Sequence, residues 1–230
     1  MERIAYRFLE KAEKSWWYHG RRYAVTLALK RAGNLPQGKV LDFGAGRGAA
    51  CTMLRAYGSV DAYEIDQESA EACRARGYEK VFTDMPPVEN QYAFVSALDV
   101  VEHIEDDAGA VLGLYERMQK GGLLVVTVPA FMWLWSAHDK THMHFRRYDK
   151  KSMTELLTRA GFTVEYVTYW NMTLTPMAYL MRKVGAGGGA LLTPSPVVDA
   201  LLTALVWLES RLMYFTSLPF GISFVAVARK

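Results

Sequence analysis

Three of the chain's five histidines fall within the short polar stretch WSAHDKTHMHFRRYDKKS at residues 135–152. Histidine titrates closer to neutral pH than any other unperturbed side chain, so such a group can exchange a proton, bind a metal ion or hold a polar substrate. The segment HDKTH within the stretch differs by one acidic residue from H-E-x-x-H, the zinc-peptidase pattern. The choice among these chemistries depends on the elements that position the stretch.

A zinc site in this stretch needs a helix that places His138 and His142 on one face. His144 could be a third ligand, but Asp139 stands where the peptidases have glutamate, and no further partner pattern follows. We therefore expect no metal ion. The simplest alternative to a functional cluster is a solvated loop whose surface ion pairs have little energetic worth.

Buried apolar runs alternate with amphipathic segments from residue 39 to residue 128, which is typical of strands separated by helices. The runs are continuous rather than alternating, which favours an α/β fold with a doubly wound, mostly parallel sheet. Strands are predicted at residues 39–44, 59–66, 78–82, 92–98, 123–128, 162–170 and 223–230. Helices are predicted at residues 46–58, 67–77, 105–122 and 149–160, the last of them capped by Asp149.

The 230 residues suit one large domain with an insertion. A helical N-terminal cap is predicted at residues 1–37 and a cofactor-binding core at residues 38–170. Residues 171–221, with a glycine cluster at 185–189, break the regular rhythm and predict a helical insertion before the last strand at 222–230.

The segment VLDFGAGRG at residues 40–48 lies where the first strand turns into the first helix. Its glycines let the backbone approach a ligand, and a helix start offers free N–H groups. Glu64, about twenty residues further on, can accept hydrogen bonds from both ribose hydroxyls of an adenosine cofactor. NAD(P)-dependent oxidoreductases share these features, because GAGRGA also fits the dinucleotide pattern G-x-G-x-x-A.

Asp42 distinguishes the two classes of cofactor, because it stands immediately before the glycine loop. A carboxylate there would repel the pyrophosphate of a dinucleotide. It suits S-adenosylmethionine, which carries an ammonium and a sulfonium group and no phosphate. The alternative is that Asp42 only hydrogen-bonds the glycine turn.

Five motifs follow one another in the chain: LDFGAGRG, YEID, TDMPP, ALDVVEHIED and KGGLLVVTVPA. Together they resemble the motif series of class I S-adenosylmethionine-dependent methyltransferases, nearest to the branch that includes ubiquinone-biosynthesis O-methyltransferases and many small-molecule enzymes. The resemblance is strong over residues 39–130. It implies a Rossmann-like, seven-stranded sheet whose last strand is antiparallel. It also implies methyl transfer to a small-molecule, sugar or lipid-linked acceptor, with S-adenosylhomocysteine as the product.

The resemblance also implies which residues bind the cofactor. They are Asp42, Gly44 and Gly46 around the methionine part, Glu64 at the ribose, Ile65 at the adenine ring, Asp84 with Met85 at the adenine amino group, and Leu98 with Asp99 at the far wall. A third class, a non-catalytic S-adenosylmethionine-binding scaffold of this fold, is disfavoured by the intact acids at positions 42, 64 and 84.

The N-terminal segment SWWYHGRRYAV at residues 15–25 is rich in aromatic and basic side chains. We predict that it forms a lid in which Trp17 and Tyr18 cover the cofactor. Arg22 or Arg21 would bind the cofactor's carboxylate, since a guanidinium matches that group bidentately. The alternative is a helix that packs its rings on the sheet edge and leaves its bases in solvent.

The polar stretch follows the strand at 123–128, at the carboxyl ends of the strands, where ligands of doubly wound sheets bind. Methyl transfer is mostly a matter of positioning and needs no metal ion, although some related enzymes use magnesium. Oxygen is the favoured acceptor atom, with nitrogen or carbon as alternatives. For a hydroxyl acceptor we predict His138 as the base, oriented by Asp139, with His144 as the alternative base. Substrate-binding residues are predicted at His103, His142, Arg146, Arg147 and Tyr148.

Net charge, cysteine spacing and apolar runs indicate which partners and which location to expect. The formal charge of +3 is small and no basic stripe is present, so no nucleic-acid partner is expected. Cys51 and Cys73 fit no zinc spacing and are expected to be buried or partly buried thiols in a reducing compartment. The N-terminus resembles no signal peptide, and the apolar run at 200–208 is far shorter than the ~20 residues of a membrane span. We therefore expect a cytoplasmic protein.

Arg182 and Lys183 flank an apolar stretch of the insertion, which suggests either a substrate lid or peripheral membrane contact.

Overall fold

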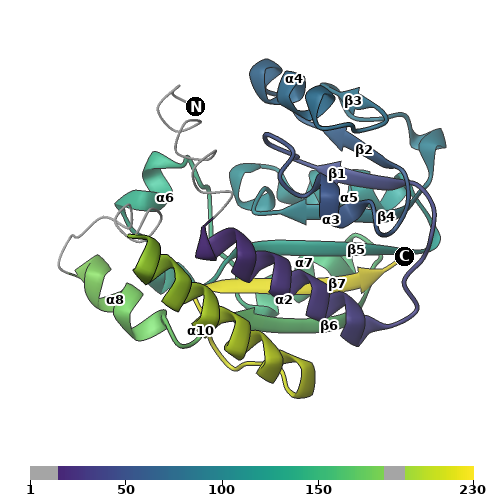
Figure 1. The fold of residues 1–230 in the computed structure, drawn as a ribbon. Coiled ribbons are helices and arrows are strands. Elements are labelled where there is room, and N and C mark those ends of the chain that lie inside the picture. The colour runs from purple at the N-terminus through teal and green to yellow at the C-terminus, as the bar shows by residue number, and fades with distance from the viewer. Residues whose placement is uncertain (1–14, 184–194) are drawn as a thin grey trace.

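The structure, a computed structural model, describes residues 15–183 and 195–230. Seven strands form one sheet in the order β3-β2-β1-β4-β5-β7-β6 (Figure 1). They are β1 Val40–Phe43, β2 Val60–Tyr63, β3 Val81–Phe82, β4 Tyr92–Leu98, β5 Met118–Pro129, β6 Thr163–Trp170 and β7 Ser223–Arg229. The central strands β1 and β4 are buried along their whole length, as expected for strands with both faces covered.

The last strand, β7, runs antiparallel to both of its neighbours, β5 and β6. The pairs among β1 to β5 are all parallel. The predicted seven-stranded, mostly parallel sheet with an antiparallel last strand is therefore confirmed. Because β1, β2, β3, β4 and β5 end at the same side of the sheet, their outgoing loops can meet there. We call this side the carboxyl edge.

Helices cover both faces of the sheet. The longer helical elements are α2 Trp16–Ala32, α3 Cys51–Leu54, α4 Gln67–Ala75, α5 Asp107–Glu116, α6 Ala137–Thr141, α7 Lys150–Arg159, α8 Thr175–Lys183 and α10 Pro196–Phe215. Three single-turn helices are η1 Val88–Asn90, η2 Val101–His103 and η3 Met132–Leu134.

The helices α2 and α10 lie side by side across one face of the sheet (Figure 1). The backbone N–H of Trp16 donates to Asp199 at the start of both helices. Near their ends, Arg31 donates to the carbonyl oxygen of Tyr214. The two helices therefore run parallel, and α2 packs against β6 and β7 with Val25 fully buried.

The helix predicted at residues 46–58 is much shorter, since only Cys51–Leu54 (α3) is α-helical. Gly46 and Gly48 have φ angles of +54° and +84°. These values lie outside the right-handed helical region, so the helix cannot begin before Gly48. The glycine loop is longer than predicted as a result.

The ends of α7 follow the predicted capping residues. Asp149 accepts a hydrogen bond from the backbone N–H of Ser152 at 2.8 Å, which satisfies a free donor of the first turn. Gly161 follows the helix with a φ of +103°, as is common where a helix ends.

The insertion before β7 contains α8 and α10. Leu202 and Val206 of α10 pack with Trp16 and Leu174 in a small apolar cluster. The glycine cluster at 185–189 lies outside the described residues. Within residues 15–183 and 195–230, no helix is both long enough and apolar enough to cross a membrane.

Candidate active site

The glycine loop leaves the end of β1 and bends over the carboxyl edge. Gly44 has a φ of +69°, and a Cβ at this position would lie 2.2 Å from Cγ2 of Val100, so conformation and packing both require glycine. At Gly46, in contrast, an added Cβ would meet no atom of the described chain within 4 Å. This open space beside the loop's backbone is where a ligand can approach it closely.

Asp42 lies buried beneath the glycine loop. Its carboxylate accepts hydrogen bonds from Oη of Tyr78 at 2.6 Å and from Oγ of Ser96 at 2.7 Å. Burial raises the pKa of Asp42, and these hydrogen bonds offset part of that effect. Both bonds go to side chains outside the glycine turn. Asp42 is therefore a buried acid behind the loop, and its action on a cationic ligand stays a prediction.

Four predicted cofactor-binding residues follow the ends of β2 and β3: Glu64, Ile65, Asp84 and Met85. The two carboxylate oxygens of Glu64 accept the backbone N–H groups of Gly46 at 2.7 Å and of Asp66 at 2.9 Å. Burial raises the pKa of Glu64. Ile65 is 71% exposed, Asp84 is exposed and Met85 is half-buried. An open apolar side chain beside two carboxylates is compatible with an adenosine site.

A cavity of about 110 Å³ lies between α2 and the start of α3. Tyr18, Arg21 and Val25 of α2 line it together with Leu98 at the end of β4. Arg21 donates to the carboxylate of Asp99 at 2.9 Å and to the carbonyl oxygen of Leu98 at 3.4 Å. The N-terminal helix therefore forms a wall of the site beside the glycine loop.

The structure corrects the predicted position of Trp17, whereas the predicted role of Arg22 stays a prediction. The ring of Trp17 packs against Trp170 of β6, with 4.9 Å between ring centroids, so it faces the core rather than the cavity. Arg22 is exposed at the rim of the cavity. Arg21 shares a helix face with Tyr18, three residues earlier, and its guanidinium lies over that ring. Arg21 rather than Arg22 thus makes the polar contacts at this wall.

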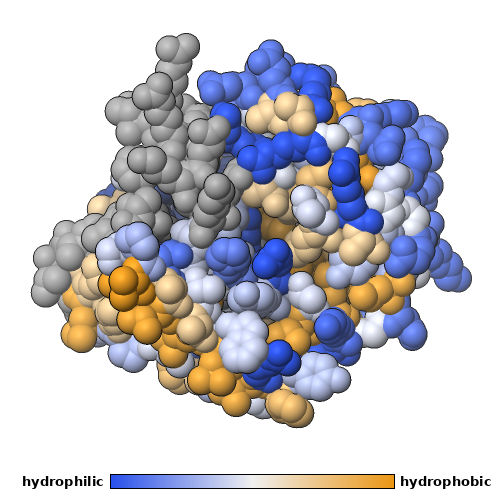
Figure 2. Space-filling view, viewed as in Figure 1, coloured by the Kyte–Doolittle hydropathy of each residue, from blue (hydrophilic) through white to orange (hydrophobic). Residues whose placement is uncertain are grey.

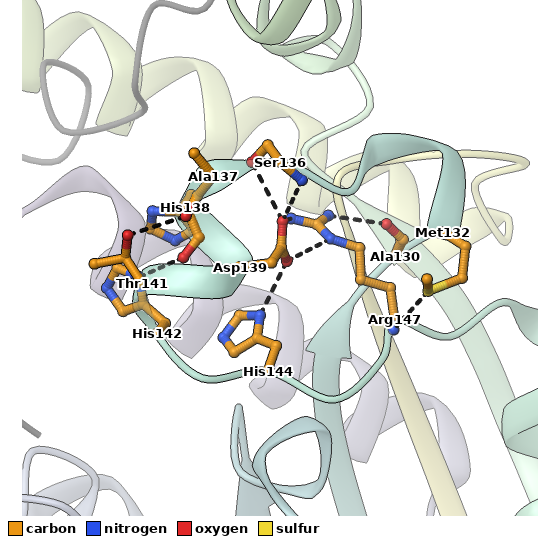
Figure 3. Close-up of polar contacts among 10 residues, drawn as sticks. All are labelled: Ala130, Met132, Ser136, Ala137, His138, Asp139, Thr141, His142, His144 and Arg147. Carbon is orange, nitrogen blue, oxygen red and sulfur yellow. Dashed lines mark hydrogen bonds and ion pairs between the residues drawn. The ribbon is translucent and has the colours of Figure 1, made fainter.

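Asp139 is the centre of the polar stretch (Figure 3). Its buried carboxylate accepts two hydrogen bonds from Arg147, at 2.7 and 3.0 Å, and one from the backbone N–H of Ser136 at 2.8 Å. Nδ1 of His144 lies 3.0 Å from Oδ1. Although burial acts in the opposite direction, these contacts hold the pKa of Asp139 well below its usual value. Asp139 therefore orients His144, which corrects its predicted pairing with His138.

His144 meets two residues that follow β4, Glu102 and His103. The rings of His103 and His144 are edge to face, with centroids 4.6 Å apart. One ligand atom from each of the three residues lies within 4.8 Å of the others. Among the described residues, Oε2 of Glu102 is buried without a hydrogen-bond partner. Burial, and then the neighbouring Asp99, raises the pKa of Glu102 well above its usual value.

A carboxylate and two imidazoles are a donor set that can hold a divalent cation. The same three groups can also exchange a proton with a substrate in the absence of a metal ion. The sequence-based expectation of no metal ion considered only ligands within the polar stretch, together with a transfer reaction that needs no metal ion. The donor set found here instead combines His144 with Glu102 and His103, two residues from another loop.

The helix α6 does place His138 and His142 on one face, with ring centroids 4.0 Å apart. Nδ1 of His142 lies 2.8 Å from the carbonyl oxygen of His138. Burial, and then His142, lowers the pKa of His138 to about 3. Burial, and then His144, lowers the pKa of His103 to about 4. Both rings are therefore neutral at pH 7.

The three predicted substrate-binding residues Arg146, Arg147 and Tyr148 contact protein groups. Arg146 and Tyr148 both bind the carboxylate of Asp107 at the start of α5, each at 2.7 Å. Arg147 also donates to the carbonyl oxygen of Ala130 at 3.1 Å. These contacts fasten the polar stretch to α5 and to the residue that follows β5, and Arg147 also holds Asp139, the partner of His144. A role of the three residues in substrate binding stays a prediction.

Several supporting residues were not predicted from the sequence. Tyr78 and Ser96 hold Asp42, and Thr127 donates to Asp99 at 2.9 Å. A lone hydroxyl in a strand or turn carries no motif, and its role appears only when another strand lies beside it. Position at a strand end is the one signal the sequence offers for Thr127.

The family model and the curated relative both describe methyltransferases. A family model described as "Methyltransferase domain" matches residues 16–167. A "probable S-adenosylmethionine-dependent methyltransferase" of Mycolicibacterium smegmatis is 28% identical over an alignment of 166 residues. The alignment covers 67% of this chain and 62% of that protein, so this chain spans less than two thirds of the relative's length.

Two solved structures share the fold. An S-adenosylmethionine-dependent methyltransferase from Mesorhizobium loti has a TM-score of 0.56 and 15% identity, covering 86% of this chain and 93% of its own. Haemonchus contortus phosphoethanolamine N-methyltransferase 2, solved with S-adenosyl-L-methionine, has a TM-score of 0.56 and 15% identity, covering 90% and 52%.

The family match spans well over half of the chain. The sheet order with its antiparallel last strand, the glycine loop above Asp42 and the acid at the end of β2 agree with it. The chain therefore belongs to the class I S-adenosylmethionine-dependent methyltransferases, with S-adenosylmethionine as its cofactor.

Proposed function

We propose that the enzyme methylates a hydroxyl oxygen of a small-molecule, sugar or lipid-linked acceptor, and that His144 takes the hydroxyl proton. The observation that carries this proposal is the 3.0 Å contact between Nδ1 of His144 and Asp139. An ionised Asp139 accepts a proton-bearing Nδ1, which leaves Nε2 of His144 with its lone pair. Nε2 of His144 can then take the proton of an acceptor that lies beside Glu102 and His103.

The position of the cluster supports a role in the transfer step. Glu102 and His103 follow Asp99, whose carboxylate is tied to Arg21 beside the cavity. One short segment thus links the predicted methionine-binding wall to the histidines. Transfer needs the acceptor oxygen in line with the methyl carbon and the sulfur, at roughly 3–3.5 Å from the carbon. Proton removal by a positioned base typically contributes about 10²- to 10⁴-fold.

A second version of this function uses a divalent cation bound by Glu102, His103 and His144. The unpartnered, buried Oε2 of Glu102 is the observation that favours it. A cation bound there would polarise the acceptor hydroxyl and ease its ionisation. Cation binding would also ionise Glu102, because metal ligands must be deprotonated.

The experiment is a methyl-transfer assay with labelled S-adenosylmethionine against phenols, catechols, sugars and lipid-linked glycans, with amines in parallel. We expect label on a hydroxyl acceptor. Activity that survives a chelator supports His144 as the base. Activity that a chelator abolishes and one divalent ion restores supports the metal version. Label on amines or carbon alone contradicts oxygen as the acceptor atom.

A further inference from the structure

The helix α10 is apolar on two opposite faces. Its inward face carries Leu202, Val206 and Met213, which are buried. Its outward face carries Leu201, Leu208, Leu212 and Phe215, which are 66%, 59%, 49% and 77% exposed. Steps of three, four and seven residues place these four side chains on one line along the helix. We call this line the α10 stripe.

A surface helix normally presents polar residues on its outward face. Figure 2 shows hydrophobic side chains gathered over α10 instead. Trp207 and Tyr214, 43% and 51% exposed, lie on the same helix. The guanidinium of Arg211 lies 4.7 Å from the ring of Trp207. Such amphipathic rings are enriched where an apolar medium meets water.

The exposed charged side chains of α2 and α10 are all basic. The neighbouring helix α2 contains no acid and exposes Arg22, Lys30 and Arg31. The two acids of α10, Asp199 and Glu209, accept backbone N–H groups of other segments, and Glu209 is only 3% exposed. Within residues 16–32 and 196–215, every exposed charged side chain is therefore basic.

We propose that the α10 stripe, with the basic side chains of α2 and Arg211 around it, docks on a membrane surface that contains anionic lipids. An interfacial helix inserts its apolar side chains among the acyl chains and holds its bases near the headgroups. This assigns a lipid surface as a partner, which goes beyond the methyl transfer proposed above.

A second copy of the chain is the competing occupant of this face. A two-fold contact would bring the same patch of both copies together. Both surfaces would then carry the same bases of α2 and Arg211 and no exposed acid of these two helices, and like charges across an interface disfavour it. A membrane with anionic lipids offers acyl chains to the apolar stripe and negative headgroups to the bases around it.

The test is flotation of the full chain with vesicles of phosphatidylcholine alone and of phosphatidylcholine mixed with phosphatidylglycerol. We expect binding to the mixed vesicles, weakened by salt. The double variant Leu201→Glu/Leu208→Glu should lower the partition coefficient at least about tenfold. The matched control Val88→Glu/Leu112→Glu changes two side chains that are 41% and 46% exposed outside α2 and α10, and should bind as the wild type does.

Circular dichroism checks that the variants fold. If the stripe variant does not, brominated lipids provide a second measurement on the folded chain: they should quench wild-type fluorescence more than that of Trp207→Phe. Three results would overturn the proposal. They are equal or no binding to both vesicle types, an equal loss in the control variant, and a dimer that the stripe variant dissociates in a chain that binds no vesicles.

Discussion

In the glycine-loop half of the site, carboxylates bind backbone amides and neutral hydroxyls, whereas in the polar stretch one carboxylate binds an arginine and a histidine. Glu64 bridges two backbone N–H groups, and Asp42 is held by hydroxyls of Tyr78 and Ser96. Asp139 instead forms a buried, bidentate ion pair with Arg147.

This difference predicts different responses to substitution. The N–H groups freed by loss of Glu64 lie at an open edge where water or a ligand can bind them, so the fold should tolerate that loss. Loss of Asp139 leaves the charge of Arg147 buried without compensation, which is far more costly. The first half should therefore control cofactor affinity, and the second should control both stability and turnover.

The largest effect is expected at the proposed base. His144→Ala should lower turnover on a hydroxyl acceptor by about 10²- to 10⁴-fold, because the proton of the acceptor loses its recipient. His138→Ala should lower turnover much less, since His138 is not the histidine bonded to Asp139. Initial rates at saturating S-adenosylmethionine measure both. A greater loss in His138→Ala would reverse the assignment.

The next effect concerns stability. Asp139→Ala should lower the free energy of unfolding by about 3–5 kcal/mol, because Arg147 then remains buried and unpaired. Glu155→Ala is the matched control, since it removes an exposed carboxylate 4.0 Å from Arg159. Measured by urea denaturation, the control substitution should lower the free energy of unfolding by no more than about 0.5 kcal/mol. Equal losses would show that the buried ion pair does not hold the polar stretch.

A smaller effect is expected from pH. The folded pKa of His138 is about 3, below the ~6.5 of an unfolded chain. Between these values the unfolded state binds the extra proton, so this group makes stability fall as pH drops below about 6.5. His138→Gln should flatten the decline between pH 7 and 4 by up to about 3 kcal/mol. His19→Gln serves as the control. Parallel curves of stability against pH for His138→Gln and the wild type would contradict the lowered pKa of His138.

The glycine-loop half could largely be predicted because its residues occupy fixed places at the ends of strands. Asp42, Glu64 and Asp84 are each defined by a buried run and the turn that follows it. The helix after Gly48 was predicted too long, because the sequence shows the glycines but not their positive φ angles.

In the polar stretch the residue types indicated chemistry, but their pairing did not follow from spacing. Asp139 turns away from His138 toward Arg147, eight residues later, because the chain folds back against Ala130, which directly follows β5. The metal-competent trio was missed because His144 meets residues from a different loop. Likewise, Trp17 faces Trp170 because packing against the sheet sets the rotation of α2.

Calorimetric titration with S-adenosylhomocysteine of the wild type, Glu64→Ala and His144→Ala tests the division of the site most directly. Glu64→Ala should bind about 10- to 100-fold more weakly, because hydrogen bonds to a charged group contribute about 1.5–3 kcal/mol. His144→Ala should bind as tightly as the wild type. Unchanged affinity in Glu64→Ala, or an equal loss in His144→Ala, would contradict the assignment of cofactor binding to one half and acceptor chemistry to the other.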